Sequence, residues 1–199
     1  NKIQIALVLG GGNIYRGREL TSLNIDQVSA DYIGMLSTIM NGIALSNFLS
    51  SNNCENSLFS SFAIGNFVKA YSKEEAEKSL VEDKIVILVG GLGNPLFTTD
   101  STASVRAVEL NSDVMLKATN VDGVYSDDPK VNKEAVKYEH LSFDEAIKKN
   151  LKVMDQTSLC FCRDNNLSVR VFNADAEGAI LEAIINENTD IGTLVELEK

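Results

Sequence analysis

The stretch that decides the fold reads GLGNPLFTTDS over residues 91–101. An apolar run, IVILV at residues 85–89, precedes it, and residues 103–110, which follow, are predicted to be helical. A strand therefore ends in glycines, and the next helix begins on hydroxyl side chains and a carboxylate. Glycine lets a backbone approach a ligand closely, and the N–H groups at a helix N-terminus suit a phosphate. Because an aspartate suits a phosphate only with a cation between them, the stretch predicts a site that handles phosphate together with lysine or Mg²⁺.

Strands and helices alternate along the rest of the chain. Apolar runs predict strands over residues 3–9, 58–64, 84–89, 113–118 and 169–172, and an edge strand over 193–195. Helical spacing predicts helices over residues 28–49, 73–81, 100–110, 143–150, 156–165 and 177–185. This alternation favours an α/β fold with a mostly parallel sheet covered on both faces. Since no repeat or linker interrupts the pattern, we expect a single domain over residues 1–199.

Composition and charge narrow the class of function. The chain has 199 residues, of which 44% are hydrophobic, enough for one domain with a core. Its formal net charge of -10, with no block of basic residues, makes it a poor partner for nucleic acids, whose binding depends on neutralising phosphates. A few local donors and a metal can still outweigh the global charge for a small phosphorylated substrate.

The cysteines, the histidine and the hydropathy point to a reduced, cytoplasmic protein. Cys160 and Cys162 lie in an apolar helical context and are expected to be small buried hydrophobes. No zinc-binding spacing occurs, so no metal-ligating residues are predicted, and the single histidine, His140, is expected at the surface. No apolar run approaches the ~18 residues of a membrane span, and no signal peptide is recognisable.

A second glycine segment, GGGN at residues 10–13, closes the first predicted strand. It has two interpretations: a tight strand-to-helix turn, or a phosphate-cradling loop whose N–H groups no side chain obstructs. It is neither a P-loop nor a dinucleotide fingerprint, because the required Gly-Lys-Ser/Thr and Gly-x-Gly-x-x-Gly patterns are absent there. Arg16 could reach a phosphate, or it could be a solvated surface residue.

Other candidate residues also have a structural alternative. Residues 98–101 could be a helix cap, although four consecutive hydroxyl or carboxylate side chains exceed what a cap needs. Lys117 ends a predicted strand, where α/β sheets bind ligands, and Tyr125 and Asp128 follow in a turn-rich loop. Asp31 and Asp155 sit at helix starts, where they either stabilise the helix dipole or act in a site.

Several longer motifs, in order along the chain, carry a family resemblance. They are GGGNIYRG at 10–17, DYIGML at 31–36, MNG at 40–42, GNPLFTTD at 93–100, KATNVDGVY at 117–125, KVMD at 152–155 and RVFN at 170–173. Together they resemble the amino acid kinase superfamily, and specifically its bacterial uridylate (UMP) kinase branch. The resemblance covers almost the whole chain.

The resemblance implies a three-layer αβα sandwich with a mostly parallel central sheet. It implies Mg²⁺-dependent transfer of the ATP γ-phosphoryl group to UMP, which gives UDP and ADP in pyrimidine nucleotide biosynthesis. Members of the branch are cytoplasmic homohexamers, trimers of dimers, that respond to the allosteric effectors GTP and UTP. The helix that carries Asp31 and Met40 forms part of the dimer contact in that family, although a helix with such an apolar stripe more often faces a core.

The resemblance also implies roles for individual residues. For UMP it implies Gly11, Asp31, Leu92, Gly93, Asn94, Pro95, Leu96, Phe97, Thr98 and Thr99. For ATP it implies Gly12, Arg16, Thr119, Tyr125 and Asp128. For catalysis it implies Asp100, Asp155 and Lys117, which would organise the phosphates and the Mg²⁺ that accompanies ATP.

The chain departs from the family pattern at two places. The family opens with a strand ending in Lys-x-Ser-Gly, whose lysine grips the transferred phosphoryl group, and nothing here matches it. Because the first residue is Asn1, we expect an N-terminal portion to be absent from this sequence, and we expect the sequence as written to be weakly active or inactive. Leu92 stands where many relatives carry threonine, which places contacts near the uracil and the GTP response in doubt.

Two other functions compete with this interpretation. One is a different member of the superfamily, such as an acetylglutamate or carbamate kinase, against which the GNPLFTTD motif argues. The other is a non-catalytic nucleotide-binding module, which the missing lysine segment favours.

Overall fold

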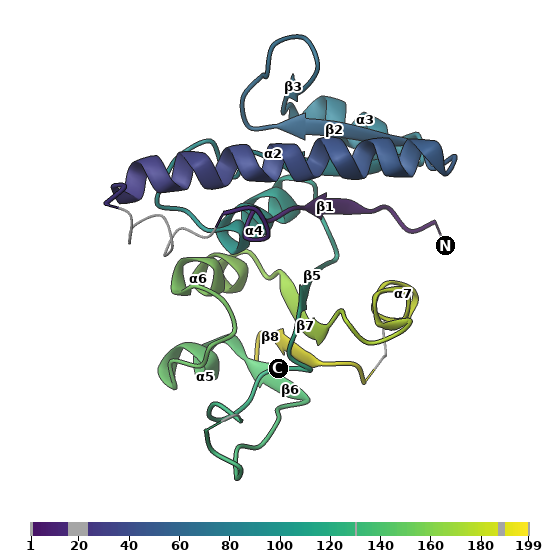
Figure 1. Cartoon of the computed structure of the whole chain (residues 1–199). Helices are drawn as coiled ribbons and strands as arrows, with labels where there is room; N and C mark the ends of the chain where they lie inside the picture. The colour runs from purple at the N-terminus through teal and green to yellow at the C-terminus, as the bar shows by residue number, and fades with distance from the viewer. Residues whose placement is uncertain (1, 16–23, 130, 187–189, 199) are drawn as a thin grey trace. The chain divides into compact units, whose positions relative to one another are not determined.

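The computed structural model describes residues 2–15, 24–129, 131–186 and 190–198. They form two compact units, Asn1–Thr102 and Ala103–Lys199. Each unit contains a four-stranded sheet with helices on both faces (Figure 1). The α/β class and the αβα layering predicted from the sequence are thereby confirmed, and the assignment of residues 1–199 to a single domain stays a prediction.

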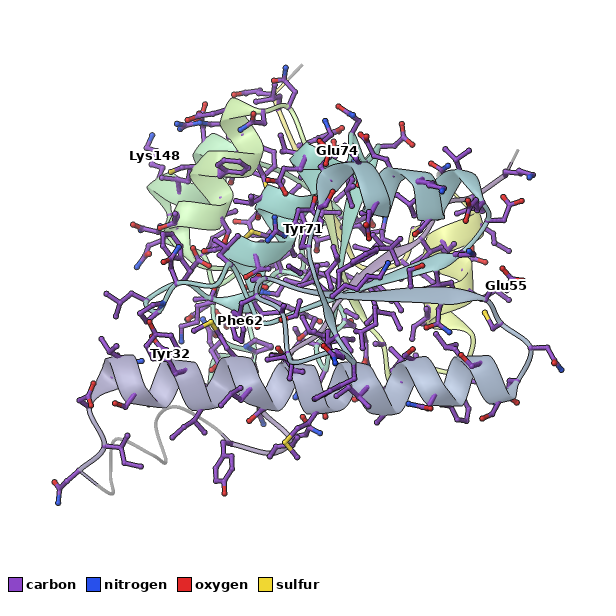
Figure 2. The ribbon with its side chains drawn as sticks, turned by 90° about the horizontal axis from the view of Figure 1, so that it is seen from above. Tyr32, Glu55, Phe62, Tyr71, Glu74 and Lys148 are labelled. Atoms are coloured by element: carbon purple, nitrogen blue, oxygen red, sulfur yellow. The ribbon has the colours of Figure 1, made fainter. Side chains whose placement is uncertain are left out.

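The sheet of the first unit is entirely parallel, in the order β1-β4-β2-β3. Its strands are β1 (Ala6–Val8), β2 (Asn56–Ser60), β3 (Lys69–Ala70) and β4 (Ile85–Val89). Helix α2 (Gln27–Ser51) and helix α3 (Lys73–Val81) cover opposite faces of β2 and β4 (Figure 2). Strand β4 is the central element, and its residues from Val86 onward are buried on both faces, which explains its continuous apolar run.

Helix α2 is the longest element, with Tyr32 near its N-terminal end and Glu55 beyond its C-terminal end (Figure 2). Asp26 caps it by accepting a hydrogen bond from the Ser29 N–H at 3.0 Å. The sequence has no unbroken apolar run of membrane-spanning length, but α2 meets the requirement of length and composition that core helices of globular proteins also meet. An 18-residue window of α2 has a mean hydropathy of 1.2 and few charges, so by length and composition this helix could cross a membrane. Polar and small residues interrupt the apolar residues of this window, so the sequence shows no continuous apolar run. In the structure, 28% of the window is buried.

The second unit has a mixed sheet in the order β5-β7-β8-β6. Its strands are β5 (Val114–Thr119), β6 (His140–Ser142), β7 (Ser168–Asn173) and β8 (Thr193–Glu196). Only the β7–β8 pair is antiparallel among the pairs in this sheet that the described residues form. Its helices are α5 (Phe143–Lys148), α6 (Gln156–Asp164) and α7 (Ala179–Ile185), while α4 (Thr99–Glu109) begins in the first unit and continues into the second.

Two hydrophobic clusters cover the two faces of this sheet. Val169 and Val171 of β7 pack with Leu159 and Phe143 from the side of α5 and α6. Phe172, the next residue along β7, packs with Ala179 and Ala183 of α7. Neighbouring residues of a strand point to opposite faces, so β7 contributes to both clusters. Cys162 is fully buried in the first cluster, as the sequence predicts, whereas Cys160 is only half-buried.

Most element predictions are confirmed to within about two residues, but the strand predicted over 3–9 covers only Ala6–Val8. The strand predicted over 58–64 ends at Ser60, because the chain turns there toward β3. The helix predicted from 177 is confirmed to within two residues and begins at Ala179, after Gly178 adopts a positive φ of 76°. Strand β8 is not an edge strand, since it lies between β7 and β6. Strands β3 and β6 were not predicted, because two or three residues are too short to show a periodic pattern.

Candidate functional site

One side of α2 contacts both glycine segments of the first unit. The contacting residues are Asp31, Met35, Thr38 and Asn41. Their spacing of three or four residues places them in one row along the helix. The row connects segments that are far apart in the sequence, so α2 acts as the support for both predicted nucleotide-binding loops.

The first glycine segment is fixed to α2 through Asn41. The Asn41 amide donates to the Gly10 carbonyl oxygen at 2.7 Å and to Asn13 Oδ1 at 2.7 Å. Asn13 Nδ2 donates in return to Asn41 Oδ1 at 3.1 Å. Gly11 is buried against the helix, and a Cβ placed on it would lie 2.7 Å from the Gly34 carbonyl oxygen. The close approach of loop and helix therefore requires glycine at position 11.

The second glycine segment follows β4 and contacts the same helix. The Gly90 N–H donates to Thr38 Oγ1 at 2.7 Å, and Ser61 Oγ donates to the Gly91 carbonyl oxygen. Asp31 then holds the far end of the loop, because its Oδ2 accepts the Leu96 N–H at 2.7 Å. Its Oδ1 accepts a hydrogen bond from Gln27 Nε2, also at 2.7 Å.

Leu96 is the strained residue of this loop. Its φ is +70°, a left-handed conformation that costs a branched side chain about 1–2 kcal/mol, and its side chain is 71% exposed. Burial of the side chain therefore does not explain the conformation. The hydrogen bond from its N–H to Asp31 supports it instead, and strained backbone of this kind clusters at ligand sites.

This contact gives a testable expectation for Asp31. We expect Asp31→Ala to lower the free energy of unfolding by about 1–2 kcal/mol, because the Leu96 N–H loses its acceptor. Hydrogen exchange at the Leu96 amide should accelerate in parallel. Gln27→Ala removes only the second contact of Asp31 and serves as the control, with a change below about 0.5 kcal/mol. An unchanged Leu96 exchange rate in Asp31→Ala would show that the carboxylate does not support the loop.

At the start of α4, one of the hydroxyl and carboxylate residues caps the helix. Thr98 Oγ1 accepts the Ser101 N–H at 3.1 Å, so Thr98 is the residue that caps the helix. Asp100 lies within the first turn, where its charge is favoured by the helix dipole. Thr99 faces the first glycine segment, since a Cβ on Gly10 would lie 3.9 Å from Thr99 Oγ1. The cap accounts for Thr98, and the roles of Thr99 and Asp100 beyond the helix start stay predictions.

In the second unit, Lys117 and Thr119 lie toward the C-terminal end of β5. Lys117 pairs in register with Val171 of β7, and the Thr119 carbonyl oxygen accepts the Ala174 N–H at 2.8 Å. These two strands are parallel, so both end at the same edge of the sheet. Ligands bind at this edge in open α/β folds.

The loop after β5 holds Tyr125 and Asp128 through two neighbouring carboxylates. Tyr125 Oη donates to Asp122 Oδ1 at 2.8 Å, and this hydrogen bond raises the pKa of the phenol. Asp127 Oδ1 accepts the Asp128 N–H at 2.8 Å, and Asp127 Oδ2 accepts from Asn132 Nδ2 at 3.0 Å. The Asn132 hydrogen bond, the Asp128 N–H and nearby Lys152 hold the pKa of Asp127 below its usual value.

Asp155 caps α6, as predicted. Its Oδ1 accepts the Ser158 N–H at 2.8 Å, and its Oδ2 accepts the Ser158 hydroxyl at 2.7 Å. His140, predicted at the surface, is exposed and lies 3.7 Å from Glu196. A further role of the Asp155 carboxylate, besides capping α6, stays a prediction.

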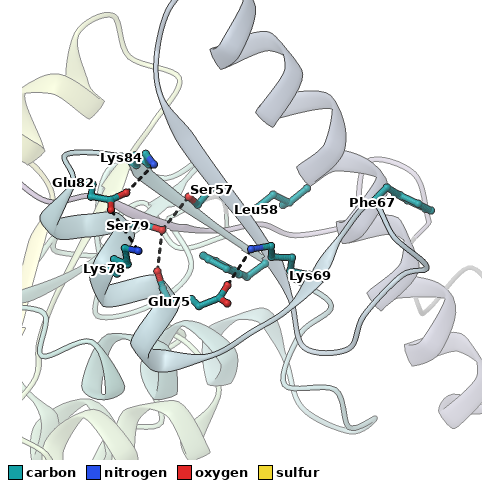
Figure 3. A pocket seen from close by; sticks show the side chains of 10 residues that line it. Ser57, Leu58, Phe67, Lys69, Glu75, Lys78, Ser79, Glu82 and Lys84 are labelled. Carbon is teal, nitrogen blue, oxygen red and sulfur yellow. Dashed lines mark hydrogen bonds and ion pairs between the residues drawn. The ribbon is translucent and has the colours of Figure 1, made fainter.

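A separate pocket of about 460 Å³ lies on the α3 face of the first unit (Figure 3). Its lining includes the exposed Phe67 and three lysines that each form an ion pair with a glutamate. Lys69 pairs with Glu75, and both Lys78 and Lys84 pair with Glu82. Sequence analysis did not find this pocket. Lysines and glutamates at helical spacing are typical of a solvated helix face, and only the structure shows that they line a cavity.

Within the first unit, Gly11 and the loop at residues 92–99 both contact the N-terminal half of α2, which also carries Asp31. Arg16 lies outside the described residues. Within the second unit, Lys117, Thr119, Tyr125 and Asp128 follow one another through β5 and its loop, and Asp155 starts α6. Sequence analysis did not single out Thr38 or Lys137, whose partners Gly90 and Asp122 are distant in the sequence.

Comparison with known proteins identifies the family. A model of the amino acid kinase family matches residues 1–173, and the chain belongs to this family. It is 47% identical to a uridylate kinase of Coxiella burnetii over 194 residues, which cover 98% of this chain and 79% of that protein. It is 45% identical to a uridylate kinase of Alcanivorax borkumensis, with 98% and 76% covered.

Solved structures agree with the sequence relatives. The UMP kinase from Bacillus anthracis superposes with a TM-score of 0.93 at 39% identity, covering 98% of this chain and 80% of that one. The UMP kinase from Ureaplasma parvum gives a TM-score of 0.90 at 41% identity, with 96% and 81% covered. The resemblance to the uridylate kinase branch and the amino acid kinase fold are thereby confirmed.

Proposed function

We propose that this protein is a uridylate kinase that transfers the γ-phosphoryl group of ATP to UMP, giving UDP and ADP, in pyrimidine nucleotide biosynthesis. The observation that carries the proposal is the loop at residues 93–100, GNPLFTTD, which the Asp31 carboxylate and the Thr98 cap hold at the N-terminus of α4. It occurs in a chain whose relatives over nearly its full length are uridylate kinases.

We assign the acceptor to the first unit. Gly11, Asp31 and residues 92–99 are proposed to hold UMP, with the ordered backbone after β4 near the base and the start of α4 near its phosphate. A helix N-terminus offers N–H donors and a favourable dipole to an anion. The carboxylate of Asp31 can accept further hydrogen bonds, such as those from ribose hydroxyls, besides its two protein partners.

We assign the donor to Gly12, Arg16, Thr119, Tyr125 and Asp128, and the organisation of the phosphates to Lys117, Asp100 and Asp155. Phosphoryl transfer needs mainly positioning and charge neutralisation, which a lysine supplies and carboxylates support by orienting cations. These side chains are of the types that this chemistry requires. Asp128, in a loop ordered by Asp127, would accept hydrogen bonds from ribose hydroxyls.

The residues present fit Mg²⁺ that arrives with ATP. Mg²⁺ binds through one or two carboxylates together with substrate phosphates and water rather than in an all-protein cage. The described parts of the chain contain no cluster of three or more His, Cys, Asp or Glu residues that could hold a metal ion. Asp100 and Asp155 are the carboxylates that would orient the metal, whose contribution is to neutralise charge on the phosphoryl group.

The test is acceptor-dependent ADP release by protein expressed from its complete reading frame, with ATP and Mg²⁺. We expect release with UMP at the rates usual for kinases, ~1–100 s⁻¹, and little with acetylglutamate or carbamate. Release with another acceptor and none with UMP would contradict the proposal. Calorimetric binding of UMP or UTP without any turnover would support the non-catalytic module instead.

We also propose that the protein forms homohexamers, built from dimers through α2, and acts in the cytoplasm under the control of GTP and UTP. Tyr32, Leu36 and Met40 recur every four residues on α2 and are 48%, 50% and 59% exposed. An exposed apolar row of this kind marks an interaction surface.

The dimer proposal predicts the effect of a charge on this row. We expect Met40→Glu to shift the assembly to smaller species, because a partner subunit would bury the new carboxylate without a counterion. Light scattering coupled to size exclusion measures the mass. Val81→Glu places the same charge on an exposed residue of α3 and should leave the mass unchanged. Equal masses for both variants would remove α2 from the dimer contact.

A further inference from the structure

The loop after β5 contains a charged group whose partners are 3 and 15 residues away along the chain. Asp122 accepts the Tyr125 hydroxyl at 2.8 Å on Oδ1 and lies 3.7 Å from Lys137 Nζ through Oδ2. We propose that Asp122, neutralised by Lys137, is a positioning residue that fixes the ring of Tyr125 for binding ATP. This inference rests on the role of Tyr125 in the proposed function.

The backbone brings the three residues together. Tyr125 and Lys137 form an antiparallel bridge, and flanking hydrogen bonds join Ser126 N–H to the Val136 carbonyl oxygen at 2.9 Å and Tyr138 N–H to the Val124 carbonyl oxygen at 2.9 Å. The two segments thus form a short ribbon that sets the position of Tyr125 relative to Lys137.

Gly123 makes room for the lysine. A Cβ on this residue would lie 2.9 Å from Lys137 Cε and 2.7 Å from Thr193 Oγ1, and its φ is +152°. The aliphatic stem of Lys137 therefore passes over Gly123 on its way to Asp122. This packing explains why the lysine side chain is only 31% exposed although its ammonium group ends beside a surface carboxylate.

The electrostatics suit a nucleotide site. A carboxylate beside a polyphosphate would repel it, but the Lys137 ammonium offsets the charge of Asp122. The carboxylate then acts as a hydrogen-bond acceptor for the phenol. The hydrogen bond from the Tyr125 hydroxyl to Asp122 keeps the aromatic ring in one orientation. The ring therefore loses less conformational entropy when a purine stacks on it. The hydrogen bond to Asp122 also raises the pKa of Tyr125, which keeps the phenol in its donor form.

The inference predicts a specific kinetic pattern. We expect Tyr125→Phe and Asp122→Ala each to raise KM for ATP about 3- to 10-fold, the loss that one hydrogen bond explains. The turnover number and KM for UMP should change less than about twofold, because the ring acts in donor binding and not in the chemical step. Asp122→Asn keeps an oxygen acceptor and should be intermediate.

The double variant Asp122→Ala/Tyr125→Phe tests whether the two residues act together. If Asp122 acts through the phenol, the double variant is no worse than either single variant. Additive losses, or an effect of Asp122→Ala with none of Tyr125→Phe, would overturn the inference. Asp164→Ala is the matched control, because Asp164 is an equally exposed carboxylate of the same unit, paired with Arg163 at 3.0 Å.

A spectroscopic readout separates positioning from a purely structural role. In protein labelled with ¹³Cζ-tyrosine, with the signal assigned through Tyr125→Phe, the pKa of Tyr125 should fall toward its ordinary value in Asp122→Ala. An unchanged titration would contradict the contact itself. Calorimetric titration with ATP keeps the test independent of the acceptor, since the same ranking of affinities is expected even if UMP proves not to be the substrate.

Discussion

Asp100→Asn is expected to lower the turnover number by about 10²–10³-fold while leaving the fold intact. The Thr98 hydroxyl caps α4 by accepting the Ser101 N–H, and the change at residue 100 leaves this capping hydrogen bond in place. Neutralising a carboxylate in the first helical turn costs only about 0.3–1 kcal/mol of dipole stabilisation. A catalytic carboxylate that orients cationic groups around the phosphates has no such substitute, because asparagine carries no charge.

Two further variants make the Asp100 experiment decisive. Thr98→Ala removes the cap and should lower the free energy of unfolding by about 1 kcal/mol. Glu109→Gln neutralises a carboxylate at the other end of the same helix, where it pairs with Arg106 at 2.7 Å, and should leave turnover unchanged. Steady-state kinetics and urea unfolding on all three variants measure the two effects separately. Near-normal turnover of Asp100→Asn would return this residue to a stabilising role in the helix.

The sequence predicted those parts of the fold that depend on residues close together in the chain. The run at residues 85–89 is apolar throughout because β4 lies inside a parallel sheet, and such a run needs no distant partner to be recognised. The cap of α6 at Asp155 is equally local, since the carboxylate bonds a residue three positions along. In contrast, β8 seemed an edge strand because nothing in residues 193–195 tells that β6 pairs with its other side.

The parts of the candidate site that the sequence missed depend on distant partners. Asp31 was recognised as a charge at a helix start, but its bond to the Leu96 N–H joins residues 65 positions apart. Thr38 shows no motif of its own and matters because Gly90 lies against it. In the sequence, Lys137 is one lysine in a polar loop, and only the structure shows that it lies next to Asp122. Sequence motifs therefore predicted the loops, while the structure shows which helix and which side chains hold them.

Gly11→Ala is the second variant with a large expected effect. The added methyl group would lie 2.7 Å from the Gly34 carbonyl oxygen and 2.8 Å from Ser37 Cβ, and both belong to α2. Contacts this short require a shift, and the backbone of a long helix cannot move aside as a flexible side chain can. We therefore expect the first glycine segment to separate from α2, which should stretch the bonds that Asn41 makes to Gly10 and Asn13.

The expected outcome is a loss of about 1–3 kcal/mol in the free energy of unfolding, the usual cost of overpacking, together with a fall in UMP affinity. Gly34→Ala is the matched control, because a Cβ there meets nothing within 4 Å and alanine favours a helix over glycine by about 1 kcal/mol. Urea unfolding and calorimetric titration with UMP measure both quantities. If Gly11→Ala bound UMP as tightly as Gly34→Ala, the close packing of the glycine segment on α2 would have no part in holding the acceptor, and the site would depend on the loop after β4 alone.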